Sequence, residues 1–178
     1  QQSNFRSHER ISMLALTISD VKDFMNKLLI GEVFDNFSLV EASVTTFNTF
    51  TIDGHLQQDF FDTDTVEEYK KEAVEYSLWR DVKPYCFSII RGKRTPLNFK
   101  IVFQLSPFQA QNLLKNLGRQ STTSVCNFYL NIQYKSKSLL CTAGVSYSSF
   151  SLDKKSEHLW DDMLCRFLEG NHIPFQRL

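Results

Sequence analysis

The chain contains 178 residues, of which 42% are hydrophobic and sixteen are phenylalanine. This is the length of one domain, with enough apolar side chains for an aromatic-rich core. The 20 basic and 20 acidic residues cancel, which argues against a protein that coats nucleic acid by bulk charge but leaves room for a local basic face. No apolar run approaches the roughly 20 residues of a membrane-spanning helix, so we expect no membrane partner.

The N-terminal residues and the cysteines indicate a cytoplasmic domain. Residues 1–12 lack the apolar stretch of a signal peptide, and we interpret them as an expression remnant or an unstructured extension before one domain over 13–178. Without a signal sequence, a reducing cytoplasm is the default location. The four cysteines lie inside predicted elements without C-x-x-C spacing, so we expect buried free thiols. They are Cys86, Cys126, Cys141 and Cys165.

The first elements are a strand, a helix and a second strand. Residues 14–18 alternate as strand residues do, and Ser19 stands where a helix N-cap belongs. Apolar residues then recur at helical spacing and stop at Gly31, which predicts a helix over 20–30. Residues 37–45 predict the second strand.

A two-residue hairpin turn is predicted at Asp53-Gly54. This dipeptide is a strong hairpin signal, because a type I′ turn needs positive φ at both central residues. A turn there would set Phe47 opposite Phe60.

The middle of the chain predicts a helix followed by a strand. Thr65 and Glu68 have the spacing of a capping box, which predicts a helix over 65–76. We interpret residues 77–84 as a connection, because it contains a proline, and 85–91 as a strand.

A strand over 97–105 then leads into a helix over 107–117. Ser106 and Gln109 are placed as N-cap and N3 residues, with proline at the first helical position.

The clearest hairpin turns at Ser136-Lys137. Its strands alternate apolar and polar residues, so a slip by one residue would oppose apolar to polar side chains. This register also keeps Cys126 and Cys141 apart, and we expect no disulfide between them. The predicted pairs are Phe128 with Val145, Leu130 with Ala143, Ile132 with Cys141 and Cys126 with Tyr147.

These elements together predict an α+β fold of antiparallel hairpins with about four helices and an irregular tail after Gly170. Residues 13–61 and 97–150 share one order, a strand, a capped helix and further strands. This indicates an internal pseudo-repeat, although such an order also arises by chance in α+β chains. The four helices are predicted over 20–30, 65–76, 107–117 and 156–169.

Three segments carry a resemblance to a known family: FNTFTIDG (47–54), EYSLW (75–79) and TPLNFKIVFQLSP (95–107). They resemble a bacterial family of domains of unknown function, which implies a cytoplasmic bacterial protein without a known activity. The element order is also similar to one domain of the DNA sliding clamps, in which a strand, a helix and three strands occur twice. That resemblance implies a clamp-like fold, and it is an analogy of fold alone.

Basic residues suggest a contact with nucleic acid. Three cations surround a predicted hairpin tip, and others lie on the polar faces of the helices over 20–30 and 107–117. Such cations can contact phosphates non-specifically, but a solvated turn or an ordinary exposed helix face has the same composition. The candidate residues are Lys22, Lys27, Lys115, Arg119, Arg91, Lys93 and Arg94.

The acidic and histidine residues give no catalytic or metal-binding motif. The acids Asp59, Asp62, Asp64, Glu67 and Glu68 could bind a divalent cation, but they lack the glycine and the terminal glutamate of a calcium loop, and they suit the start of a helix. No two histidines have metal-binding i, i+4 spacing, and no phosphate-binding or dinucleotide motif occurs. We therefore predict no catalytic residue, metal or cofactor from motifs.

The leading hypothesis is a non-enzymatic binding module that contacts nucleic acid through clamp-like helix faces. One alternative is an enzyme with a dispersed site around His55 and the acids after it. Another is a protein-interaction scaffold that uses its aromatic surface and tail, and an oligomer is compatible with either. The sequence names neither the partner nor a substrate.

Overall fold

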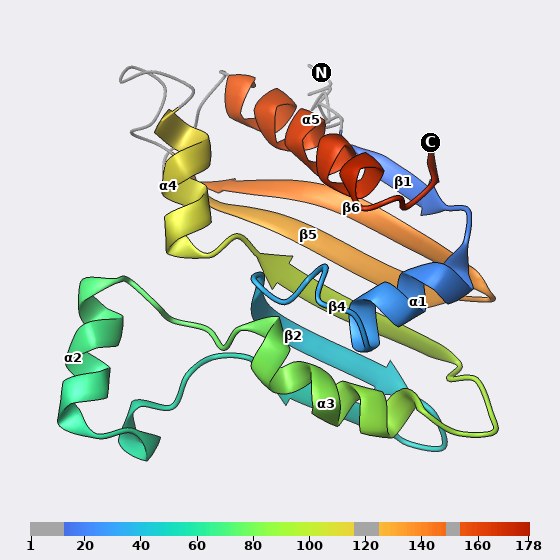
Figure 1. Cartoon of the computed structure of the whole chain (residues 1–178), viewed down its shortest axis with the longest axis horizontal. Coiled ribbons are helices and arrows are strands. Elements are labelled where there is room, and N and C mark those ends of the chain that lie inside the picture. The colour runs from blue at the N-terminus through green and yellow to red at the C-terminus, as the bar shows by residue number, and fades with distance from the viewer. Residues whose placement is uncertain (1–12, 116–124, 149–153) are drawn as a thin grey trace, which may run out of the picture.

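The computed structural model describes residues 13–115, 125–148 and 154–178, which form one antiparallel sheet with helices packed against it (Figure 1). The strands are ordered β3-β2-β4-β5-β6-β1-β7. Every neighbouring pair is antiparallel, so the predicted α+β class is confirmed. The strands are β1 (Ala15–Ile18), β2 (Ser38–Thr45), β3 (Thr49–Asp53), β4 (Asn98–Gln104), β5 (Val125–Lys135), β6 (Ser138–Tyr147) and β7 (Phe175–Arg177).

Five α-helices occur in the described residues, four at predicted positions and one, α3, that was not predicted. Helices α1, α3 and α5 lie across the sheet, whereas α2 stands away from it (Figure 1). A short 3-10 turn over Gln58–Phe60 precedes α2. The helices are α1 (Val21–Leu29), α2 (Thr63–Lys71), α3 (Trp79–Ile90), α4 (Pro107–Lys115) and α5 (Lys155–Gly170).

The core lies mainly between helices α1, α3 and α5 and one face of the sheet (Figure 1). Alternate residues of β4 and β5 are buried, while Lys100 and Gln133 on the opposite face are exposed. Trp79 of α3 packs edge-on against Phe103, with ring centroids 5.1 Å apart, and Trp160 of α5 packs against Phe128 at 5.9 Å. Burying each such ring contributes about 1.5–3 kcal/mol or more. The buried strand residues are Phe99, Ile101, Phe103, Phe128, Leu130, Ile132 and Tyr134.

The prediction of a strand over 85–91 is wrong, because this segment is the second half of helix α3. Trp79, Val82 and Cys86 recur at helical spacing and pack into the core. The helix is held although Pro84 removes one backbone hydrogen bond. The Lys83 ammonium, which is mostly buried, pairs with Asp35 at 2.6 Å and donates to the Gly31 carbonyl.

The prediction of a hairpin turn at Asp53-Gly54 is also wrong. Thr45 pairs with Thr49, so the chain turns earlier, and Phe60 lies in no strand. Gly54 instead passes so close to β2 that a Cβ would lie 1.8 Å from the Leu39 carbonyl oxygen. The glycine is therefore required for a close approach of two backbone segments.

Several details of the termini and caps differ from prediction. Asp20, rather than Ser19, caps α1, and Asp62, rather than Thr65, caps α2. The tail is not irregular, since Phe175–Arg177 pairs with β1 as strand β7. The capping box at Ser106 is confirmed by two reciprocal hydrogen bonds with Gln109 at 3.3 Å.

The predicted register of β5 and β6 is confirmed for three pairs. They are Phe128 with Val145, Leu130 with Ala143 and Ile132 with Cys141. The turn residues Ser136 and Lys137 have φ of 53° and 63°, as a type I′ turn requires. The pairing of Cys126 with Tyr147 is wrong, because an irregularity in β5 sets Val125 opposite Tyr147.

The two stretches of the pseudo-repeat share an order of elements but not a pairing pattern. Strand β4 lies beside β5, which follows it after helix α4. Strand β1, by contrast, is separated from β2 by β4, β5 and β6. The sheet therefore does not contain the same unit twice.

We predict that Gly54→Ala destabilises the protein by about 1–3 kcal/mol, since the added methyl group must displace the β2 backbone. Gly170→Ala is the matched control, because a Cβ there meets nothing within 4 Å. Urea unfolding of both variants measures the difference, and an unchanged midpoint for Gly54→Ala would contradict the close approach.

The buried thiols predict a loss of stability at alkaline pH. Burial raises the pKa of Cys86 from 9.0 to about 11 and that of Cys141 to about 12. Above pH 9 the unfolded thiols ionise while the folded ones keep their protons, so stability falls as pH rises from about 9 towards 12. Guanidinium unfolding between pH 7 and about 10.5 should show this fall, and it should flatten in Cys86→Ala/Cys141→Ala. An equally steep fall in that variant would assign the effect to other groups.

Candidate functional site

A groove of about 760 Å³ lies at the end of the sheet that carries the β5–β6 turn. It is enclosed by α1, the last turn of α3, the segment 91–97 and residues of that turn. Its volume falls in the range of about 300–1,000 Å³ that is usual for ligand sites.

The floor of the groove is apolar and mainly aliphatic. Met25 and Leu29 come from α1 and Ile90 from the end of α3. Below them, the rings of Phe99 and Tyr134 stack with centroids 5.2 Å apart, but both are almost fully buried. Phe87 of α3, which is half-buried, adds one aromatic ring to a lining that is otherwise mainly aliphatic where it is exposed.

Two aliphatic side chains in the groove are largely exposed. Ile30 is 64% exposed and Leu97 is 67% exposed. A ligand that covers such water-exposed aliphatic surface is bound more tightly, because each Å² of apolar area removed from water stabilises the complex by about 25 cal/mol.

Among the residues that the structure describes, the rim of the groove carries five exposed cations and no acid. Among the described residues, the ion pairs involve other lysines, those at positions 27, 83 and 100. The rim cations thus have no anionic partner in the described part of the chain. They are Lys22 on α1, Arg91, Lys93 and Arg94 after α3, and Lys137 in the β5–β6 turn.

Local structure explains how these cations gather. Helix α3 ends at Ile90, Arg91 after it is already extended, and the chain is exposed from there as far as Thr95. Pro96 is buried and returns the chain to the sheet. The Leu97 N–H then bonds the Thr45 carbonyl at 2.9 Å, which directs the chain into β4.

The structure brings together four of the seven residues proposed from sequence, namely Lys22, Arg91, Lys93 and Arg94. Lys27 is not among them, because it pairs with Asp23 at 2.6 Å and donates to the His172 carbonyl. Lys115 is exposed on α4, away from the groove, and Arg119 lies outside the described residues.

Sequence reasoning missed Lys137 and the apolar floor. Lys137 belongs to the confirmed β5–β6 turn, whose two residues are exposed. The floor had no local signal, because its residues come from α1, α3, the segment before β4, and the two strands β4 and β5.

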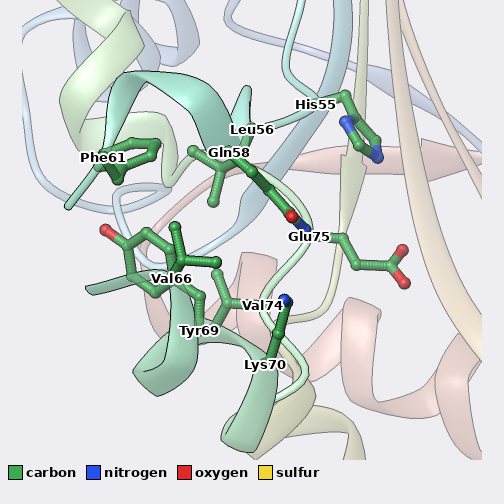
Figure 2. Close-up of a pocket in the computed structure, with 9 residues that line it drawn as sticks. All are labelled: His55, Leu56, Gln58, Phe61, Val66, Tyr69, Lys70, Val74 and Glu75. Atoms are coloured by element: carbon green, nitrogen blue, oxygen red, sulfur yellow. The ribbon is translucent and has the colours of Figure 1, made fainter. Parts of the chain in front are cut away.

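A second, smaller pocket of about 190 Å³ contains His55, the centre of the proposed dispersed enzyme site (Figure 2). Figure 2 shows His55 and Glu75 on one side of it, and Phe61 and Tyr69 on the other. The His55 ring packs edge-on against Tyr76 at 5.5 Å. Burial, and then the charge of Glu75, raise the pKa of Tyr76.

The acids after His55 do not gather around it. Asp59, Asp62 and Asp64 are exposed and lie outside the lining of this pocket. Asp62 accepts a hydrogen bond from the Thr65 N–H at 2.7 Å and caps α2. In the described residues, no group of three or more His, Cys, Asp or Glu side chains is placed to hold a metal ion.

The fold and the groove define a class of protein: a two-layer α+β domain with a basic groove of apolar floor at one end of its sheet. A family model for DUF5721, a family of unknown function, matches residues 27–176, so the chain belongs to that family. No curated protein and no solved structure matches it, and the resemblance to sliding clamps gains no support. Of the described helices, none is long and apolar enough to cross a membrane.

We predict that Asp62→Ala weakens helix α2. Hydrogen bonds, first that from the Thr65 backbone, lower the pKa of Asp62 below 3.8. The cap therefore stabilises α2 above about pH 4, and its contribution is lost as pH falls through the lowered pKa. At pH 6, amide hydrogen exchange over 63–71 should be faster in Asp62→Ala than in the control Asp64→Ala. Equal exchange in both would show that Asp62 does not hold the helix.

Proposed function

We propose that this protein is a non-enzymatic binding module that holds the phosphates of a nucleic acid in its basic groove. The observation that carries the proposal is the gathering of five exposed cations, with no acid among the described residues that line the groove. In a chain of zero formal net charge, such a concentration creates a local positive potential that attracts polyanions. A bacterial cytoplasm, which the family resemblance implies, belongs to the same proposal.

The chemistry of the rim suits phosphate. Lysine and arginine that neutralise phosphates release condensed counterions, which makes binding tighter at low salt. Arg91 and Arg94 add planar guanidinium groups that can bond two phosphate oxygens at once.

Helices α1 and α4 do not have the clamp-like arrangement in which both would face one nucleic acid. Helix α1 follows Ile18 at the strand ends near the β5–β6 turn, because Thr17 pairs with Leu140. Helix α4 follows Gln104, which pairs with Tyr129 near the opposite end of β5. The lysine-bearing faces of α1 and α4 therefore do not form one surface.

The scaffold hypothesis remains as a second candidate because three phenylalanines are largely exposed. Phe47, Phe60 and Phe108 lie on different segments, and exposed aromatic side chains are common anchors at protein interfaces. A molar mass that rises with concentration in light scattering would favour it.

We predict that Arg91→Gln/Lys93→Gln/Arg94→Gln weakens binding of a fluorescent oligonucleotide about tenfold or more at low salt. The logarithm of the binding constant falls as the logarithm of the salt concentration rises, and loss of three contacts should make this slope shallower by about 2. Fluorescence anisotropy across a salt series measures both quantities.

The control is Lys70→Gln/Lys71→Gln/Lys115→Gln, which removes the same charge from exposed lysines outside the groove. It should change affinity little. Equal weakening in both triple variants would assign binding to overall charge, and absence of binding to the wild type would end the proposal.

A further inference from the structure

Resting on the proposed function, we propose that the ligand of the groove is single-stranded nucleic acid, with bases packed on the apolar floor and phosphates along the cationic rim. The groove combines two surfaces that different parts of one nucleotide would contact. The floor offers apolar area and the rim offers charge.

The apolar floor distinguishes a single strand from a duplex. A duplex stacks its bases inside and presents phosphates and sugars, so Ile30 and Leu97 would stay uncovered or face charged groups. A single strand can turn its unpaired bases towards an apolar surface while its backbone follows a basic groove. The exposure of both aliphatic side chains beside five cations therefore favours the single strand.

The rim favours a chain of phosphates over one anionic headgroup. Its cations come from three separate elements, α1, the segment after α3 and the β5–β6 turn. Cations that are spread over several elements suit a polymer with one charge on each residue better than a single phosphate. Asn26 and Thr95, which also line the groove, supply neutral hydrogen-bonding groups for base edges.

The first measurement compares an oligonucleotide of about 12 nucleotides with the duplex of the same sequence, by anisotropy at equal salt. We expect the single strand to bind about tenfold more tightly. Equal or tighter binding of the duplex would overturn the inference while leaving the proposed function in place.

The second measurement uses Ile30→Ser/Leu97→Ser, in which both substituted side chains are largely exposed. Affinity for the single strand should fall about threefold to tenfold with an unchanged salt slope, because no phosphate contact is lost. The matched control is Met13→Ser/Leu178→Ser, which removes two exposed aliphatic side chains outside the groove. An unchanged affinity of the groove variant would show that bases do not use the floor.

Two outcomes separate this inference from the function on which it rests. Absence of binding to any oligonucleotide would remove both proposals. Tighter binding of an acidic amphipathic peptide than of the oligonucleotide, weakened by the same Ile30→Ser/Leu97→Ser change, would overturn the single strand in favour of a protein partner. Thermal unfolding of each variant checks the fold. If the melting temperature of Ile30→Ser/Leu97→Ser falls, Leu97→Ala replaces this variant.

Discussion

The whole structure depends on the burial of one face of a single antiparallel sheet. Strands β4 and β5 present phenylalanine, leucine and isoleucine to that side, and a lone sheet cannot bury them. Trp79 and Trp160 bring α3 and α5 onto this face. Each indole N–H donates to a backbone carbonyl at 2.8 Å, Leu28 for Trp79 and Tyr129 for Trp160, so both large rings are buried with their polar group satisfied.

The groove is a consequence of how this face is covered. Trp79 holds the beginning of α3 against the sheet and against α1, while the end of α3 leads into an exposed basic loop. The space between α1, this loop and the β5–β6 turn is then lined by apolar residues from the helices and the sheet, and by cations from α1, the loop and the turn. Binding residues are often found on exposed loops that a rigid scaffold holds in place. Here the packed sheet and helices are the scaffold, and the basic segment after α3 is the loop.

Local patterns predicted much of the fold. Helical spacing and capping signals identified four helices. Strict alternation set the register of β5 and β6, because a slip would have exposed Leu130 and Ile132. The errors came where a local signal competed with packing. Pro84 suggested a break, yet Trp79 and Cys86 bury the same face of a continuous helix. Asp53-Gly54 suggested a turn, yet Gly54 is needed for contact with β2.

The sequence by itself determined the class of fold, the central hairpin and the basic character of residues 91–94, since these depend on periodicity, turn chemistry and composition within short segments. Only the tertiary structure decided that these cations share a groove with Lys22 and Lys137, and that Lys27 is held by Asp23. It also decided the pairing of β7 with β1, which are more than 150 residues apart. Such contacts join distant segments through the packing of the core, and no local pattern encodes which segments will meet.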